Sequence, residues 1–309
     1  MKELNVLDQH ITNDYAIYHG DSCEVLKGIP DNTIHYSIYS PPFASLFTYS
    51  SSERDLGNCA DTNDFLCHFK FIAKELHRVL LPGRLMSVHC MDIMALKRRD
   101  GYMGLFDFPG HLIRIFQEIG FIYHSRVAIW KDPLREATVN RVHGLLHKQI
   151  IKDSSLCRQG LCDYLLTFRK LGENPEPISH PEGFTEYIGD NEPQSGVYSH
   201  QVWRRYASPV WMDINQTDTL QYRSVREEKD EKHICPLQLQ VIRRALELWT
   251  NKNDVVLSPF GGIGSEPVVA IEMRRKAIAI ELKESYYKQM KANCKNAVNK
   301  LKNNGLLDD

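Results

Sequence analysis

The sequence has no long apolar run. No stretch approaches the roughly 20 consecutive apolar residues that a helix needs to span a bilayer. The N-terminal segment MKELNVLDQH also lacks the apolar core of a secretory signal. We therefore expect a cytoplasmic protein with no membrane anchor.

An excess of charge of one sign is also missing. Lys and Arg total 38 and Asp and Glu total 39, so the net charge is −1. This balance excludes a protein that coats nucleic acid through bulk charge, and any nucleic-acid surface must be a local cluster. The 309 residues, 42% of them hydrophobic, suit one large domain with an insertion or two small domains.

No pattern of cysteines typical of disulfides or zinc modules is present. The eight cysteines are scattered through a chain without an export signal, which predicts reduced thiols. Cys157 and Cys162 form the closest pair, with His143 and His147 upstream, but their spacing is not the C-x2-C of common zinc modules. We expect no metal site.

Internal repeats and low-complexity tracts are absent as well, and short β-rich runs instead alternate with amphipathic stretches. This alternation predicts an α/β fold with a mostly parallel sheet flanked by helices. The expected strands cover residues 34–39, 85–90, 121–130, 163–168, 254–257 and 276–281. The expected helices cover residues 64–81, 109–119, 236–249 and 285–302.

One segment, residues 171–232, differs in amino-acid composition from the rest of the chain. It holds five prolines, four glycines and seven aromatic residues, and it ends in the charge run REEKDEK. So many aromatic residues argue against disorder. We interpret this segment as an irregular inserted module, so that the chain divides into residues 1–170, 171–232 and 233–309.

A glycine-rich turn, SPFGGIGS at 258–265, lies between a predicted strand and a predicted helix. Glycines let a backbone approach a ligand closely, and a helix N-terminus supplies free N–H groups. Ser265 could cap that helix, and Glu281, at the end of the next strand, could accept hydrogen bonds from ribose hydroxyls. The expected cofactor-binding residues here are Pro259, Phe260, Gly261, Gly262, Gly264, Ser265 and Glu281.

The residue pattern of this turn narrows the choice of cofactor. It does not fit G-x-G-x-x-G, and the Gly-Lys-Ser/Thr of a phosphate-binding loop is absent. Both facts disfavour dinucleotides and nucleoside triphosphates and favour S-adenosylmethionine, which has no phosphates. The alternative is a tight turn that only packs.

A second motif, Ser40-Pro41-Pro42-Phe43, follows the predicted strand 34–39. The prolines fix the backbone as it leaves the sheet, so the Ser40 hydroxyl and the Pro41 carbonyl project rigidly where ligands bind in open α/β folds. Two acceptors beside the flat ring of Phe43 suit an exocyclic amine on a planar base, which would be held outside the double helix. The alternative is a proline-rich strand terminus with a structural role only.

Together the two motifs resemble the DNA methyltransferases that modify exocyclic amines. The order, with Ser-Pro-Pro-Phe first and the glycine-rich turn last, is similar to their permuted β class. Ser-Pro-Pro-Phe is typical of cytosine-N4 members, whereas adenine-N6 members more often have Asp-Pro-Pro-Tyr. The resemblance implies a Rossmann-like methyltransferase fold, S-adenosylmethionine as cofactor, catalytic roles for Ser40, Pro41, Pro42 and Phe43, and a possible homodimer.

The resemblance covers most of the chain outside 171–232. It implies that Asp21, in Gly-Asp-Ser, meets the cofactor adenine and that His233 and Pro236 close over the methionine end. It also places residues 171–232 where the family has its target recognition region. One departure is Ser258, where the family usually has an aspartate, and the lost carboxylate could weaken cofactor binding.

Contacts with double-stranded DNA must come from local clusters of cations and aromatic residues, because the net charge is near zero. The basic cluster Lys97-Arg98-Arg99 is interpreted instead as part of a solvent-exposed face. The candidate DNA-binding residues are Arg135, Arg141, Lys148, Trp203, Arg204 and Arg205.

The favoured function is transfer of a methyl group from S-adenosylmethionine to cytosine N4 in DNA. Adenine-N6 methylation by the same apparatus is the nearest alternative. An RNA or protein amide methyltransferase is disfavoured, because in those families Asn-Pro-Pro-Tyr normally follows the cofactor turn. Cytosine-C5 chemistry is disfavoured because no Pro-Cys motif is present. From another class, the chain could be an inactive DNA-binding module with Ser258 as its lesion.

Overall fold

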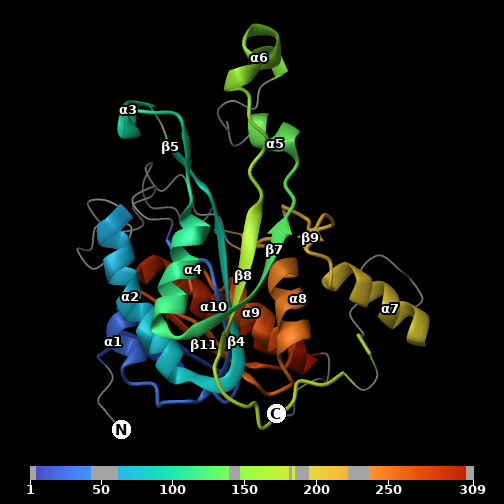
Figure 1. Ribbon diagram of the computed structural model, residues 1–309. Helices are drawn as coiled ribbons and strands as arrows, with labels where there is room; N and C mark the ends of the chain where they lie inside the picture. Colours follow the sequence, from blue (N-terminus) through green and yellow to red (C-terminus); the bar gives the residue numbers. More distant parts are fainter. Residues whose placement is uncertain are drawn as a thin grey trace.

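The computed structural model describes residues 5–42, 62–95, 97–138, 147–180, 183–184, 195–221 and 237–303. Within these ranges the main feature is a nine-stranded sheet with the order β1-β2-β11-β10-β3-β4-β8-β7-β9 (Figure 1). None of the helices in the described ranges combines the length and the apolar character that a membrane span requires.

Five neighbouring strands form the parallel part of the sheet. They are β2 (Tyr15–His19), β11 (Lys276–Glu281), β10 (Val255–Ser258), β3 (Ile34–Tyr39) and β4 (Leu80–Met91). Their carboxyl ends therefore meet at one edge of the sheet. The run IHYSIY of β3 is almost entirely buried, as expected for a central strand with helices on both faces.

The remaining strands complete the two sides of the sheet. β1 (Asp8–Ile11) pairs with β2 in antiparallel fashion. On the other side, β8 (Asp163–Lys170) runs antiparallel to β4 and to β7 (Phe121–Ile129), and the two-residue β9 (Val210–Trp211) pairs in parallel with β7.

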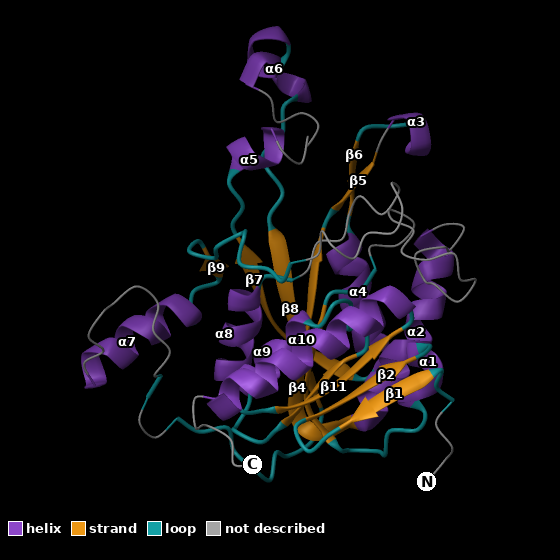
Figure 2. Cartoon of the chain, turned by 180° about the vertical axis from the view of Figure 1, so that it is seen from behind, coloured by secondary structure: helices purple, strands orange, loops and turns teal. Residues whose placement is uncertain are grey.

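Helices cover both faces of the sheet (Figure 2). On one face, α8 (Leu239–Trp249), α9 (Ser265–Glu272) and α10 (Glu284–Asn303) share a hydrophobic cluster with the strands. On the other face, a second cluster joins the strands to α1 (Ser22–Leu26), α2 (Thr62–Val79) and α4 (Phe108–Ile119). The predicted α/β fold, a mostly parallel sheet flanked by helices, is confirmed.

Helix α4 shows why the chain forms these elements locally. The Asp107 side chain accepts a hydrogen bond from the Gly110 backbone N–H, and Pro109 occupies the first turn. Leu112, Ile115 and Phe116 are buried at helical spacing. Gly120 ends the helix with φ of 110°, a left-handed conformation that favours glycine.

Two projections extend from the carboxyl edge of the sheet (Figures 1 and 2). The first arm, residues 92–107 after β4, contains β5 (Ile93–Ala95), α3 (Lys97–Asp100) and β6 (Gly104–Phe106). The second arm, formed by the described residues 130–138 and 147–162 between β7 and β8, contains α5 (Pro133–Thr138), α6 (His147–Lys152) and a 3-10 turn (Ser154–Leu156). The sequence patterns did not predict either arm.

Several predicted bounds need correction. Strand β4 begins at Leu80, directly after α2, so Pro82 and Gly83 lie within the strand instead of separating the two elements. β1 and β2 were not predicted. Segment 171–232 is more regular than its composition suggests, since it contains the twelve-residue helix α7 (Ser195–Tyr206) and contributes β9 to the main sheet.

Candidate functional site at the carboxyl edge of the sheet

The two motifs singled out in the sequence lie beside each other in the structure. The Ser40 motif follows β3, the glycine-rich turn follows β10, and these strands pair in parallel. The rings of Tyr39 and Phe260 lie 5.6 Å apart, between centroids. Ser22, next to Asp21, donates a hydrogen bond from its hydroxyl to the carbonyl of Pro259. Residues from distant parts of the chain therefore form one site.

The glycine-rich turn is held by its own backbone and by Glu281. The Gly261 N–H donates to the Ile280 carbonyl at 2.8 Å, and the Gly264 N–H donates to the Gly261 carbonyl at 2.8 Å. The Glu281 carboxylate accepts from the Gly262 N–H at 2.7 Å and from the Lys283 N–H at 2.8 Å. Glu281 thus fixes the shape of the turn from the end of β11.

Glycine occupies three positions of the turn for three different structural reasons. A Cβ on Gly261 would lie 2.8 Å from the Met290 sulfur and 3.2 Å from the Ala279 Cβ, so a larger residue would force its neighbours to move. Gly264 has φ of +98° and is the N-cap of α9, so Ser265 is the first helical residue and its predicted role as N-cap is wrong. Gly262 has φ of +51°, and no atom of the described residues lies within 4 Å of the place a Cβ would take there. A ligand can approach the backbone at Gly262.

Polar groups beside the turn are buried. The Ser258 hydroxyl at the end of β10 is buried and has no hydrogen-bond partner among the described residues. Glu266, in the first turn of α9, is also buried, and burial together with the nearby charge of Glu281 raises the pKa of its carboxyl to about 8. At pH 7 Glu266 is therefore mostly neutral.

The Ser40 motif makes contacts that were not predicted. The Ser40 hydroxyl lies 3.2 Å from Nδ1 of His89 and 3.4 Å from the His89 carbonyl oxygen. His89 lies on β4, which pairs with β3, so the two residues meet across adjacent strands. Pro41 is buried and Pro42 half-buried, which fits a fixed backbone at this point.

Behind His89 lies a buried ion pair. His89 Nε2 is 3.2 Å from one carboxylate oxygen of Asp163, and the ammonium of Lys131 is 2.6 Å from the other. Burial alone would raise the pKa of Asp163, but Lys131 and His89 lower it to about 2. The signal available in the sequence was a histidine and an aspartate within otherwise apolar strands, SVHC and DYLLTF.

The structure places the other predicted residues as follows. Asp21 is the N-cap of α1, where its carboxylate accepts from the Cys23 N–H at 2.8 Å. Its contact with a cofactor adenine stays a prediction. Four predicted site residues lie outside the described ranges, namely Phe43, Arg141, His233 and Pro236.

The predicted DNA-binding residues fall into two places. Arg135 on α5 and Lys148 on α6 belong to the second arm, above the carboxyl edge. The Lys97 cluster, for which a solvated face was favoured, lies on α3 at the end of the first arm. By contrast, α7 lies to one side of the sheet and carries the exposed residues Trp203, Arg204 and Arg205.

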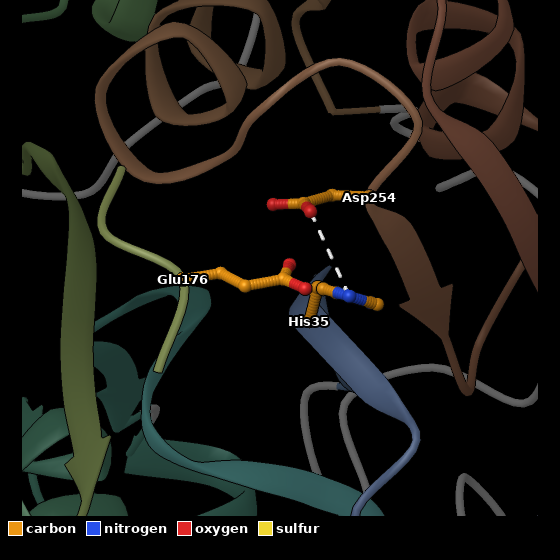
Figure 3. Close-up of side chains that lie close together, drawn as sticks. All are labelled: His35, Glu176 and Asp254. Atoms are coloured by element: carbon orange, nitrogen blue, oxygen red, sulfur yellow. Dashed lines mark ion pairs between the residues drawn. The ribbon is translucent and has the colours of Figure 1, made fainter. Parts of the chain in front are cut away.

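One cluster of potential metal ligands lies at the opposite edge of the sheet. His35, Glu176 and Asp254 bring ligand atoms within 4.8 Å of one another (Figure 3). Arg84 already occupies the Asp254 carboxylate, with contacts of 3.1 and 3.5 Å, and the His35 Nδ1 accepts from the Val255 N–H. The ion pair of Arg84 with Asp254 and the contacts of His35 with Asp254 and Val255 therefore give the cluster a structural role, joining β3, β4 and the start of β10.

Comparisons with solved structures define the class of fold. PvuII DNA methyltransferase (cytosine-N4-specific), from Proteus hauseri, aligns over 97% of both chains with a TM-score of 0.64 and 19% identity. TTHA0409 from Thermus thermophilus, complexed with S-adenosyl-L-methionine, aligns over 93% of this chain and 95% of its own, with a TM-score of 0.66 and 20% identity. The fold is that of the S-adenosylmethionine-dependent methyltransferases, as the sequence predicts.

Sequence comparison identifies the family. The family model N6_N4_Mtase, described as DNA methylase, matches residues 34–292. The chain belongs to this family of DNA methylases. Relatives include the type II methyltransferase M.MjaI of Methanocaldococcus jannaschii, 24% identical over 89% of both chains. M.BglII of Bacillus subtilis is 25% identical over 90% of this chain and 67% of its own length. Membership of a DNA methylase family supports S-adenosylmethionine as the cofactor.

Proposed function

We propose that the chain is a site-specific DNA methyltransferase that transfers a methyl group from S-adenosylmethionine to the exocyclic N4 of cytosine. The observation that carries this proposal is the adjacency of the Ser40 motif and the glycine-rich turn on paired parallel strands. Hydrogen-bond acceptors for an amine thus lie beside a turn suited to a nucleoside-bearing cofactor.

The residues of the turn fit this cofactor. The open approach at Gly262 lets a ligand touch the backbone, and the Glu281 carboxylate lies at the same point to accept ribose hydroxyls. The Ser258 hydroxyl, which has no hydrogen-bond partner in the described part of the chain, offers a further polar contact. A neutral Glu266 avoids a second negative charge beside Glu281. When bound, S-adenosylmethionine supplies an electrophilic methyl group on a sulfonium centre.

Residues Ser40 and Pro41 would act on the amine. The lone pair of an aromatic amine is delocalised into its ring, so acceptors that bind its hydrogens favour the tetrahedral nitrogen that can attack a methyl carbon. The Ser40 hydroxyl and the Pro41 carbonyl are such acceptors, and the rigid backbone of two prolines holds them in place. Phe43 is proposed to stack on a cytosine flipped out of the duplex.

The two arms are proposed to hold double-stranded DNA above this edge. Both arms extend from the edge that holds Ser40, and both carry cations near their ends, Lys97 and Arg98 on one and Lys148 and Lys152 on the other. Such charges contact phosphates. Residues 171–232 are proposed to recognise the target sequence, and a homodimer is proposed as the working form.

Replacement of Ser40 by alanine tests the role of the catalytic motif. A hydrogen bond to an amine that gains positive charge is worth about 1.5–3 kcal/mol, so Ser40→Ala should lower kcat by about 10- to 100-fold. Cofactor affinity, measured by calorimetry with S-adenosylmethionine, should stay unchanged because Ser40 lies outside the turn. Equal losses in kcat and in cofactor affinity would show that Ser40 only supports the pocket.

A further inference from the structure

We propose that Asp163 and Lys131 hold His89 in one tautomer, and that His89 thereby orients the Ser40 hydroxyl with its lone pairs toward the target amine. This inference rests on the proposed function, and it makes His89 and Asp163 positioning residues that act through Ser40. Nothing in the sequence motifs assigns a role to either residue.

The first step concerns the charge of Asp163. Its carboxylate lies 2.6 Å from the Lys131 ammonium and is buried at the start of β8. A carboxylate paired with a lysine in this way stays ionised, and an ionised carboxylate can only accept hydrogen bonds. The His89 nitrogen that faces Asp163 must therefore carry the proton.

The second step concerns the imidazole of His89. Nε2 is 3.2 Å from Asp163, an ion-pair contact that is not yet aligned as a hydrogen bond. Catalytic hydrogen bonds commonly become aligned only in the substrate complex. With the proton on Nε2, a neutral imidazole has a bare lone pair on Nδ1. That atom, 3.2 Å from the Ser40 oxygen, is then an acceptor.

The third step concerns the Ser40 hydroxyl. A serine has one proton and two lone pairs, and its proton points to the best acceptor available. Among the described residues, the hydroxyl has two neighbours on the protein side, His89 Nδ1 and the His89 carbonyl, and both are acceptors. With the Ser40 proton directed there, both lone pairs remain for the hydrogens of an amine. The opposite tautomer would place an N–H against Ser40 and use one of these lone pairs.

Replacing Asp163 by asparagine reverses this arrangement without changing the size of the side chain. Lys131 would retain the amide oxygen, which turns the amide NH2 toward His89 Nε2. The proton of the imidazole then moves to Nδ1, and Ser40 must accept from it. We expect Asp163→Asn to lower kcat by about tenfold or more while the dissociation constant for S-adenosylmethionine stays the same.

Two further variants separate positioning from packing. In His89→Asn the amide oxygen can occupy the place of Nδ1 and accept from Ser40, so this variant should keep more activity than His89→Leu. Ser87→Ala is the matched control, because Ser87 lies on the same face of β4 and also loses buried hydrogen bonds, to Tyr36 and Thr167. Its kcat should not change.

The tautomer itself can be observed by nitrogen-15 NMR of the imidazoles in the full-length protein. The His89 signal is identified as the one missing from His89→Asn. We expect an Nε2–H tautomer in the wild type and an Nδ1–H tautomer in Asp163→Asn. An unchanged tautomer, or a kcat in Asp163→Asn equal to that of Ser87→Ala, would overturn the inference. A wild type that methylates no DNA would instead overturn the proposed function, and the tautomer measurement would still decide this inference.

Discussion

Glu266 is a carboxyl group kept neutral by its surroundings. It lies in the first turn of α9, where a negative charge is normally favoured, but it is buried and close to Glu281. Because the turn already contains the Glu281 carboxylate, a second ionised carboxylate would repel it. A protonated Glu266 carries no charge, so this segment packs without repulsion between two carboxylates.

This arrangement predicts that stability depends on pH. The pKa of Glu266 is about 8 in the folded chain against 4.5 for an ordinary glutamate, so between these values the folded state binds a proton that the unfolded state has released. The free energy of unfolding should therefore fall as pH rises from about 5 to about 8 and then level off. Denaturant titrations of the wild type and of Glu266→Gln should diverge across this window, with the variant gaining relative stability at higher pH.

A matched control for this prediction is Glu118→Gln, which also removes one carboxylate. Glu118 is exposed and pairs with Lys70 at the surface, so its replacement should leave the pH dependence of the wild type unchanged. If Glu266→Gln and the wild type lose stability in parallel as pH rises, Glu266 is ionised in the folded chain.

Residues differ in how far the sequence could predict their roles. Ser40, Gly262 and Glu281 belong to motifs whose residue types and order suggest a role, and in the structure all three lie at the carboxyl edge of the sheet. His89 and Asp163 could not be assigned, because their meaning depends on contacts with residues far away in the chain, 49 positions in the case of Ser40 and His89. Ser265 was misassigned because the left-handed Gly264 moves the helix boundary by one residue.

At the scale of elements, regular alternation predicted the core and failed at the projections. Strand β11 has the predicted bounds, and α4 and β7 differ from theirs by one residue. The elements of the first arm have only three or four residues each, too short for a periodic pattern. Strand β4 was predicted too short because Pro82-Gly83 was interpreted as the end of the preceding helix, whereas this pair lies near the beginning of the strand.

The second arm should contribute to DNA affinity through its cations. Lys148 is exposed on α6, above the edge that holds Ser40. If it contacts a phosphate, Lys148→Gln should weaken binding to all duplex sequences alike and reduce the slope of log affinity against log salt by about one. Fluorescence anisotropy with a labelled duplex at several salt concentrations measures this slope.

Arg204→Gln on α7 is the comparison for Lys148→Gln. Arg204 is also exposed, but α7 lies to the side of the sheet, away from the two arms. Residues 171–232 are proposed to recognise the target sequence through its bases, and the salt slope reports contacts with phosphates, so we expect a smaller change in this slope from Arg204→Gln than from Lys148→Gln. A loss of slope in Arg204→Gln with none in Lys148→Gln would place the duplex across α7 and contradict the role given to the arm.

At the scale of the whole molecule, the parallel sheet explains why segments far apart in the chain form one site. Residues near 21, 40, 260 and 281 all follow strands whose carboxyl ends meet at one edge. At the other edge, the ion pair of Arg84 with Asp254 joins β4 to the start of β10, and the hydrogen bond from the Val255 N–H to His35 joins β10 to β3. One end of the sheet therefore has a structural role, and the other is available for chemistry.

The most direct test of this account is nucleoside mass spectrometry of unmethylated DNA of mixed sequence after incubation with the full-length protein and S-adenosylmethionine. The account predicts N4-methylcytosine in the wild-type reaction and a strong reduction with Ser40→Ala. N6-methyladenine would contradict the assignment of the target base while leaving the fold and cofactor in place. No modified base together with no cofactor binding in calorimetry would contradict the enzymatic function and favour an inactive DNA-binding module.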